Sequence, residues 1–306
     1  MRLMRPGIFI VLLCLIVNVV ASCQPQSSPG TFTDDLGREV NIESIPQRIV
    51  SLAPSNTEIL FALGLEDKLV GVTEFCNHPE AAKDKPKIGG FSDVDIERTV
   101  ALEPDLILAT SIHDKTVIPA LEKVGLTVFA LAPDTLDEVL ADITLVGKVT
   151  GRSQEASQLV ASLEKRIKTI TDKTKVLAET ERPRTLFLTW HDPLWTVGSE
   201  TIINDLINQA GGENIAQDLS GHVTIDLETV IYRNPQVIII NTGHGEAEDL
   251  PYHYVLNEPR LRVTEAVTSG RVYQIDADIV NRPTPRMVGG LEQLARLIQP
   301  ELFGAH

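Results

Sequence analysis

Short apolar runs alternate with amphipathic segments along the chain from Arg48 onward. Strands are predicted at residues 48–53, 69–73, 106–110 and 127–130, with helices at 55–63, 117–124 and 136–149. The alternation restarts at Arg184, with strands at 185–190, 237–241 and 271–275 and helices at 202–209 and 285–298. This order predicts an α/β fold of two lobes with mainly parallel sheets flanked by helices.

One long amphipathic segment, at residues 154–178, separates the two halves. Its apolar side chains recur at helical spacing and leave the charges on the other faces: Leu159, Leu163, Ile167, Ile170, Thr174 and Leu177. A helix of this length would join the lobes as a stiff strut. We therefore expect an N-terminal lobe at 32–152, a connecting backbone helix at 153–180 and a C-terminal lobe at 181–306.

Polar residues suggest where three of the helices begin. The run Ser55-Asn56-Thr57-Glu58 has the spacing of a capping box, and Gly64 is expected to end that helix. Asp93 and Thr224 are expected to cap two further short helices, each followed by a proline that ends it.

Those two short helices belong to an internal repeat. Residues 95–107 and 226–238 align at one offset, since 226−95, 228−97 and 235−104 all equal 131. Glu97 and Glu228 therefore occupy equivalent polar positions in the first turns of equivalent helices. A carboxylate there either complements the helix dipole or contacts a partner, and the repeat alone leaves both interpretations open.

The N-terminus is typical of an exported protein. Arg2 and Arg5 precede an apolar run that is short for a membrane span and ends in Val-Ala-Ser before Cys23. This pattern resembles the cleavage box of bacterial lipoproteins, in which the cysteine is acylated. We expect a signal peptide at 1–22, lipidation of Cys23 and a flexible tether at 23–31; an ordinary secretory signal is the alternative.

Charge narrows the possible partners further. Without Arg2 and Arg5, 25 basic side chains oppose 42 acidic ones, so the formal charge is near −17. Phosphate backbones would be repelled, which excludes nucleic acid, and attachment to a membrane should depend on the acyl chains. An extracytoplasmic α/β metal-dependent enzyme is a rival class, but the sequence has no G-x-S-x-G elbow and no phosphate-binding loop.

Three separated segments, at 48–64, 96–107 and 211–215, resemble the cobalamin-, siderophore- and haem-binding proteins of ATP-driven (ABC) importers. The likeness extends from Phe32 to Phe303. It implies two α/β lobes on one backbone helix, a ligand held in the cleft between them and little lobe closure. It also implies an importer permease and its ATPase as partners, with Glu97 and Glu228 docking onto permease arginines. We expect a monomer with no resident cofactor.

Within this family the loop 72–79 looks like that of cobalamin-binding members, which carry an aromatic at the position of Phe75. Phe91 and Trp195 match two further aromatics that pack on the corrin, whereas His222 replaces an aromatic that such proteins carry. The ligand expected is a large flat corrinoid, with a ferric siderophore or haem as the alternative. His191 and Arg286 complete the expected ligand-binding set.

Several histidines follow predicted strands: His113, His191 and His244. They are candidates for metal ligation, but no recognised metal-binding spacing supports it, and hydrogen bonding to a ligand is an equal use of imidazole. We therefore expect no protein-held metal.

Overall fold

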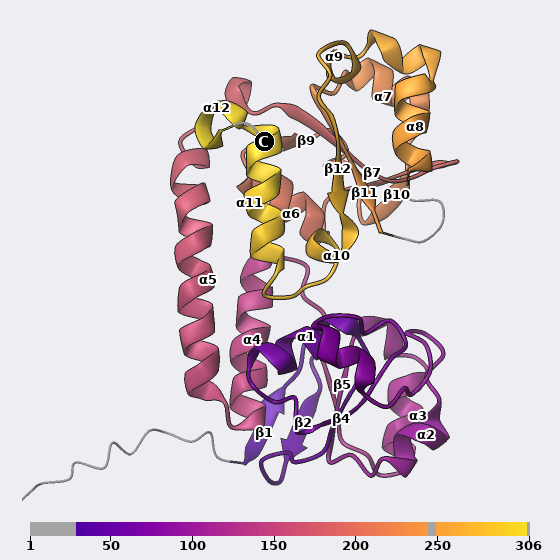
Figure 1. Cartoon of the computed structure of the whole chain (residues 1–306), viewed down its shortest axis with the longest axis vertical. Coiled ribbons are helices and arrows are strands. Elements are labelled where there is room, and N and C mark those ends of the chain that lie inside the picture. Colours follow the sequence, from indigo (N-terminus) through magenta and orange to yellow (C-terminus); the bar gives the residue numbers. More distant parts are fainter. Residues whose placement is uncertain (1–28, 244–248, 305–306) are drawn as a thin grey trace, which may run out of the picture.

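The computed structural model describes residues 29–243 and 249–304, and it confirms the two-lobed α/β fold (Figure 1). The predicted signal peptide, Cys23 and His244 lie outside the described residues. The lobes are stacked along the long axis of the molecule, and α5 runs beside both of them (Figure 1). Within the described part, no helix is both long and apolar enough to cross a bilayer.

The N-terminal lobe is built on a four-stranded parallel sheet of order β4-β3-β5-β6. A small antiparallel hairpin, β1–β2, precedes it and was not predicted. The strands of the lobe are β1 (Gly30–Thr33), β2 (Glu39–Ile42), β3 (Ile49–Ser51), β4 (Leu69–Val72), β5 (Leu106–Ala109) and β6 (Val128–Ala130). Its helices are α1 (Pro54–Ala62), η1 (Glu80–Asp84), α2 (Ile96–Ala101), η2 (Ser111–His113), α3 (Val117–Lys123) and α4 (Leu136–Thr150).

The C-terminal lobe has a mixed sheet of order β10-β8-β7-β11-β12, with β9 also paired to β7. Its strands are β7 (Arg184–His191), β8 (Leu194–Val197), β9 (Glu213–Asn214), β10 (His222–Thr224), β11 (Val237–Thr242) and β12 (Val272–Asp276). Its helices are α6 (Ile202–Gln209), α7 (Leu227–Arg233), α8 (Leu250–Asn257), η4 (Pro259–Val263), α9 (Glu265–Thr268), α10 (Ala277–Val280), α11 (Met287–Ile298) and α12 (Pro300–Phe303).

The segment around Trp195 forms a strand that the sequence pattern did not predict. It is β8, which pairs antiparallel with β7 on one side and β10 on the other. Leu194 and Thr196 are buried while Trp195 is exposed, which is the alternation of a strand with one covered face. The strand has only four residues, directly after Pro193, which is too short for its alternation of buried and exposed positions to be recognised in the sequence.

The connecting helix is α5 (Ser153–Thr174), followed by η3 (Glu179–Glu181). It buries the predicted stripe at Leu163, Ile167 and Ile170. One apolar core runs from the N-terminal sheet through α4 and α5 into α6 and α11 of the other lobe. The two lobes are therefore joined by continuous packing as well as by the chain.

The expected helix caps need correction. Helix α1 begins at Pro54, which suits the first position because that N–H needs no partner, so the predicted capping box at Ser55 and Glu58 does not form. The caps of α2 and α7 are Asp95 and Asp226 rather than the predicted Asp93 and Thr224. Each aspartate side chain accepts a hydrogen bond from the backbone N–H of the third residue of its helix. They are the first residues of the repeat itself, so the equivalence of Glu97 and Glu228 stands.

Candidate ligand cleft and docking helices

A cavity of about 640 Å³ lies between the lobes. The N-terminal lobe contributes residues that follow β3 and two aromatic loop residues, and the C-terminal lobe contributes residues that follow β11 and β12. The lining comprises Ala53, Pro54, Ser55, Phe75, Phe91, Gly243, Ala277, Asp278, Asn281, Arg282 and Pro283. Parallel strands end here, which is where open α/β sheets bind ligands.

Two of the predicted ligand-binding aromatics, Phe75 and Phe91, line this cavity. The Phe75 side chain is 56% exposed, so it is accessible at the cavity wall. Its neighbour Cys76 is buried and close to the hydroxyls of Thr57 and Thr73, which fixes the start of the loop. The cavity therefore presents an apolar wall on the side of the N-terminal lobe.

Phe91 is held in place by His113, which is fully buried. Nδ1 of His113 accepts the backbone N–H of Thr110 at 3.0 Å, so the proton sits on Nε2, which donates to the Phe91 carbonyl at 2.7 Å. The two rings also meet edge to face at 5.5 Å. Burial lowers the pKa of His113 and keeps the imidazole neutral.

The histidines do not form a metal site in the described part of the chain. Both ring nitrogens of His113 are occupied by the backbone, and the described residues contain no cluster of three metal-ligating side chains. His191 is half-buried at the end of β7, where its ring lies 4.9 Å from Trp190 and 5.6 Å from Tyr254. His191 therefore belongs to an aromatic group on the C-terminal lobe.

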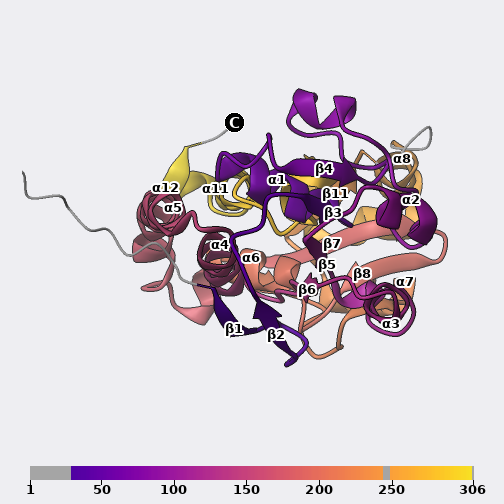
Figure 2. The same ribbon diagram turned by 90° about the horizontal axis from the view of Figure 1, so that it is seen from below.

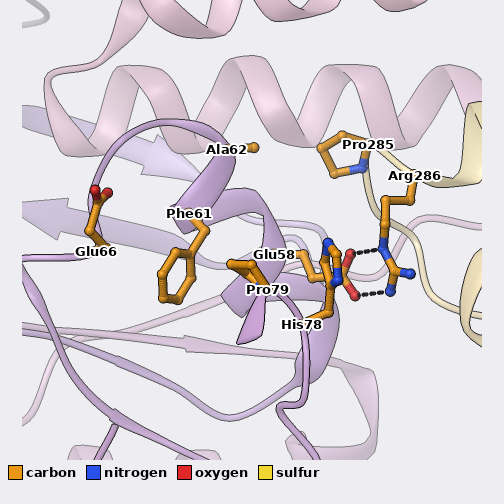
Figure 3. A pocket seen from close by; sticks show the side chains of 8 residues that line it. All are labelled: Glu58, Phe61, Ala62, Glu66, His78, Pro79, Pro285 and Arg286. Atoms are coloured by element: carbon orange, nitrogen blue, oxygen red, sulfur yellow. Dashed lines mark hydrogen bonds and ion pairs between the residues drawn. The ribbon is translucent and has the colours of Figure 1, made fainter. Parts of the chain in front are cut away.

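Glu58 and Arg286 join the two lobes directly. Their side chains form two hydrogen bonds of 2.6 Å each, one to each carboxylate oxygen, across the boundary between α1 and the start of α11 (Figure 3). The Glu58 side chain is only 4% exposed, so the charge pair is strongly shielded on the carboxylate side. The carboxylate raises the pKa of Arg286 further and keeps it charged.

A second group of polar side-chain contacts between the lobes lies nearer the cavity. Arg282 donates to Asn77 Oδ1 at 2.6 Å and forms an ion pair of 2.8 Å with Asp278, while Asn77 donates to Asp278 at 3.3 Å. Asn77 belongs to the N-terminal lobe and the other two to the C-terminal lobe. We call these five residues (Glu58, Asn77, Asp278, Arg282 and Arg286) the inter-lobe clasp.

Arg286 was expected to contact ligand, and the structure directs it to Glu58 instead of into the large cavity. It lines a smaller pocket of about 280 Å³, together with Phe61 and His78 among others (Figure 3). Asp278 and Arg282 are the members of the clasp that reach the large cavity. From the sequence, the other three members of the clasp were predicted to be a helix cap (Glu58), a ligand contact (Arg286) and a residue of the loop 72–79 (Asn77).

The remaining predicted ligand residues lie on the edge of the C-terminal sheet. Trp195 projects from β8 and His222 from the neighbouring β10, and both are exposed. Neither lines the cavity described above. Their contact with a ligand stays a prediction.

The helices that carry Glu97 and Glu228 lie one in each lobe. In both views, α2 and α7 are on the side of the molecule away from α5 (Figures 1 and 2). Both glutamates are exposed, and Glu228 pairs loosely with Arg260 at 3.4 Å. The first turn of each helix thus presents an exposed carboxylate at the surface.

Two α/β lobes packed on a shared helical backbone, with a cavity between them, are the architecture of a solute-binding protein. The chain belongs to the periplasmic binding protein family, whose model matches residues 49–279.

Individual relatives agree with this family. The chain is 34% identical to an uncharacterised ABC transporter substrate-binding lipoprotein, YvrC, of Bacillus subtilis (strain 168), over 90% of this chain and 87% of that one. Among solved structures, the periplasmic vitamin B12-binding protein BtuF of Vibrio cholerae matches with a TM-score of 0.73 and 26% identity, covering 83% and 97% of the two chains. The haem-binding protein RhuT from Roseiflexus sp. RS-1 matches with a TM-score of 0.73 and 26% identity, covering 84% and 99%.

The family sets the general role. The protein is the extracytoplasmic substrate-binding component of an ABC transporter and works with a permease and an ATPase. It is a binding protein, not an enzyme, and proteins of this family hold their ligands without a catalytic cofactor.

Proposed function

We propose that the protein is a lipid-anchored receptor that captures a corrinoid between its lobes and delivers it to the permease. Acylated Cys23 anchors it after removal of residues 1–22, and the segment between Cys23 and β1 tethers a monomeric body to the membrane; Gly30 and Thr31, which the predicted tether included, belong to β1. Glu97 and Glu228 dock onto permease arginines. The observation that carries the ligand assignment is the pair of phenylalanines, Phe75 and Phe91, on one wall of the inter-lobe cavity.

The chemistry of the cavity suits a broad ring with polar edges. Aromatic side chains bury a large flat face at little entropic cost, and Asp278, Asn281 and Arg282 bring hydrogen-bonding groups to the opposite wall. Corrin side-chain amides need donors and acceptors of this kind. The likeness to the B12-binding BtuF and the resemblance of the loop around Phe75 favour corrinoid, while the likeness to RhuT supports haem as the second candidate.

Calorimetric titration of the purified protein with cyanocobalamin tests the ligand assignment. Removing one stacked ring in Phe75→Ala or Phe91→Ala should raise Kd about tenfold to a hundredfold, on the order of 1.4 to 2.7 kcal/mol. Phe303→Ala is the matched control, because Phe303 lies on α12, outside the cavity. If the wild type binds haem or a ferric siderophore and no corrinoid, the ligand assignment is wrong.

Docking has a separate test. The double variant Glu97→Ala, Glu228→Ala should keep its ligand affinity and stability, because both side chains are exposed, while uptake falls sharply. Two exposed ion pairs contribute little energy each, so their main effect is to fix orientation on the permease. Normal uptake by the double variant would mean that neither glutamate docks onto the permease and that both only complement the dipoles of their helices.

A further inference from the structure

Tyr232 is the most exposed large hydrophobic side chain in the described part of the chain, at 89%. It lies on α7, four residues after Glu228, so the two side chains share one face of the helix. Tyrosine at a fully exposed helix position contributes little to folding. Aromatic residues of this kind are enriched at the centres of protein interfaces.

Helix α7 and the neighbouring helix η4 both carry exposed charged and apolar side chains. Glu228 is 75% exposed, and the short helix η4, beside α7, supplies Arg260 and the exposed Val263. Arg260 is itself held by Glu258 at 2.9 Å, and from there it reaches Glu228 at 3.4 Å. Arg260 therefore orients Glu228 but pairs more closely with Glu258. A partner that binds Glu228 more tightly than Arg260 does could replace this contact.

The N-terminal lobe lacks the same arrangement. At the repeat offset of 131 residues, Glu228 corresponds to Glu97 but Tyr232 corresponds to Ala101. The neighbour of Glu97 is Arg98, which pairs with Asp95 at 3.1 Å. Equivalent carboxylates on equivalent helices therefore have different surroundings, and the aromatic residue occurs in one lobe alone.

We propose that Tyr232 is the anchor of the permease contact on the C-terminal lobe, an inference that rests on the proposed docking function. Its ring packs against the arginine of the permease that pairs with Glu228. A guanidinium is planar, so it can donate hydrogen bonds to a carboxylate along its edge while an aromatic ring packs on its face. Charge complementarity with Glu228 selects a cationic partner, and Tyr232 adds the apolar contact that an exposed ion pair lacks.

A membrane surface is the competing occupant, since arginines and apolar side chains also gather on interfacial helices. The prominent carboxylate of Glu228 and the formal charge of the chain, −15, both oppose attraction to anionic lipid. The permease is therefore favoured, and lipid binding becomes one outcome of the test.

The experiment measures binding of the mature protein to its permease–ATPase complex in nanodiscs of zwitterionic lipid. Tyr232→Ala should raise Kd about tenfold, whereas Tyr232→Phe, which keeps the ring, should stay within about twofold of wild type. The matched control is Val176→Ala, an apolar residue 74% exposed just beyond α5. Ligand affinity and thermal stability should be equal in all variants.

The outcomes separate this inference from the proposed function. If Glu228→Ala weakens binding but Tyr232→Ala does not, the ring is not an anchor and docking through glutamate stands. If wild type does not bind the complex at all, the docking proposal fails and this inference fails with it. If Tyr232→Ala instead lowers binding to protein-free phosphatidylglycerol vesicles, and not to the nanodisc complex, the surface is a lipid contact and the anchor is refuted.

Discussion

Replacing Asp142 by asparagine should stabilise the protein at neutral pH and flatten the pH dependence of its stability. Asp142 lies inside α4 and is 3% exposed. Burial is the main cause that raises its pKa to about 9; the charge of Asp35, a hydrogen bond with Asp35 and the charge of Glu138 add to it. At pH 7 the folded protein therefore holds a proton on Asp142 that the unfolded chain releases.

The sign and size of the effect follow from this difference. Between the unfolded value, 3.8, and the folded value, about 9, the native state binds one proton more than the unfolded state. The free energy of unfolding therefore falls as pH rises through this window, by up to about 1.4 kcal/mol per pH unit. From pH 5 to pH 7 the loss reaches about 2.7 kcal/mol. Asparagine is neutral at every pH, and its amide can still donate to the Asp35 carboxylate.

Urea unfolding of wild type and Asp142→Asn at pH 5, 6, 7 and 8 measures the difference. The two free energies should diverge as pH rises, with the variant the more stable at pH 7 and 8. Asp137→Asn is the control, because Asp137 is on the same helix but exposed. Parallel curves for wild type and Asp142→Asn would refute the reasoning, since they would mean that Asp142 is ionised in the folded protein.

Three other predictions concern separate parts of the molecule. Glu58→Gln should lower the free energy of unfolding by about 1 to 3 kcal/mol, because it leaves the partly buried Arg286 without its counter-charge; a double-mutant cycle with Arg286→Met, read by urea unfolding, should show coupling. His113→Gln should remove a loss of stability that wild type shows as the pH falls below about 6.5, since the lowered pKa of His113 means that the unfolded chain takes up the proton first; thermal unfolding at pH 7.5 and 5.5 checks it, and equal losses would contradict it. Cys23→Ser should release the protein from the membrane fraction or leave it unprocessed, as seen by fractionation and intact mass; identical behaviour would contradict lipidation.

Elements with a long or strongly buried pattern could be predicted from the sequence. Helix α6 begins and ends as predicted, and the stripe of α5 is buried at Leu163, Ile167 and Ile170, because helical periodicity repeats often enough there to be unambiguous. The β8–β10 edge could not be recognised in the same way. Its strands are three and four residues long, and their exposed positions carry Trp195 and His222.

The clasp shows a different limit. Glu58 has the local spacing of a capping residue, and nothing near it in sequence indicates a partner 228 residues away. Asn77 and Arg282 are 205 residues apart. Pairs of this kind depend on how two lobes face each other, which single-sequence patterns do not encode. By contrast, Phe75 and Phe91 could be selected because a family resemblance, not periodicity, marked their loops.

The clasp also connects the candidate ligand site with the spacing of the lobes. Apolar packing along α4, α5 and α11 joins the lobes, and the bidentate pair of Glu58 and Arg286 adds a directional contact between them. Arg282 and Asp278 line the cavity and belong to the same clasp. A ligand that hydrogen-bonds to Arg282 therefore competes for donors that otherwise bind Asn77 across the boundary. The same side chains therefore affect both ligand affinity and the spacing of the lobes. Glu58 lies outside the lining of the large cavity, so a change in ligand Kd in Glu58→Gln would measure the coupling between lobe spacing and ligand binding.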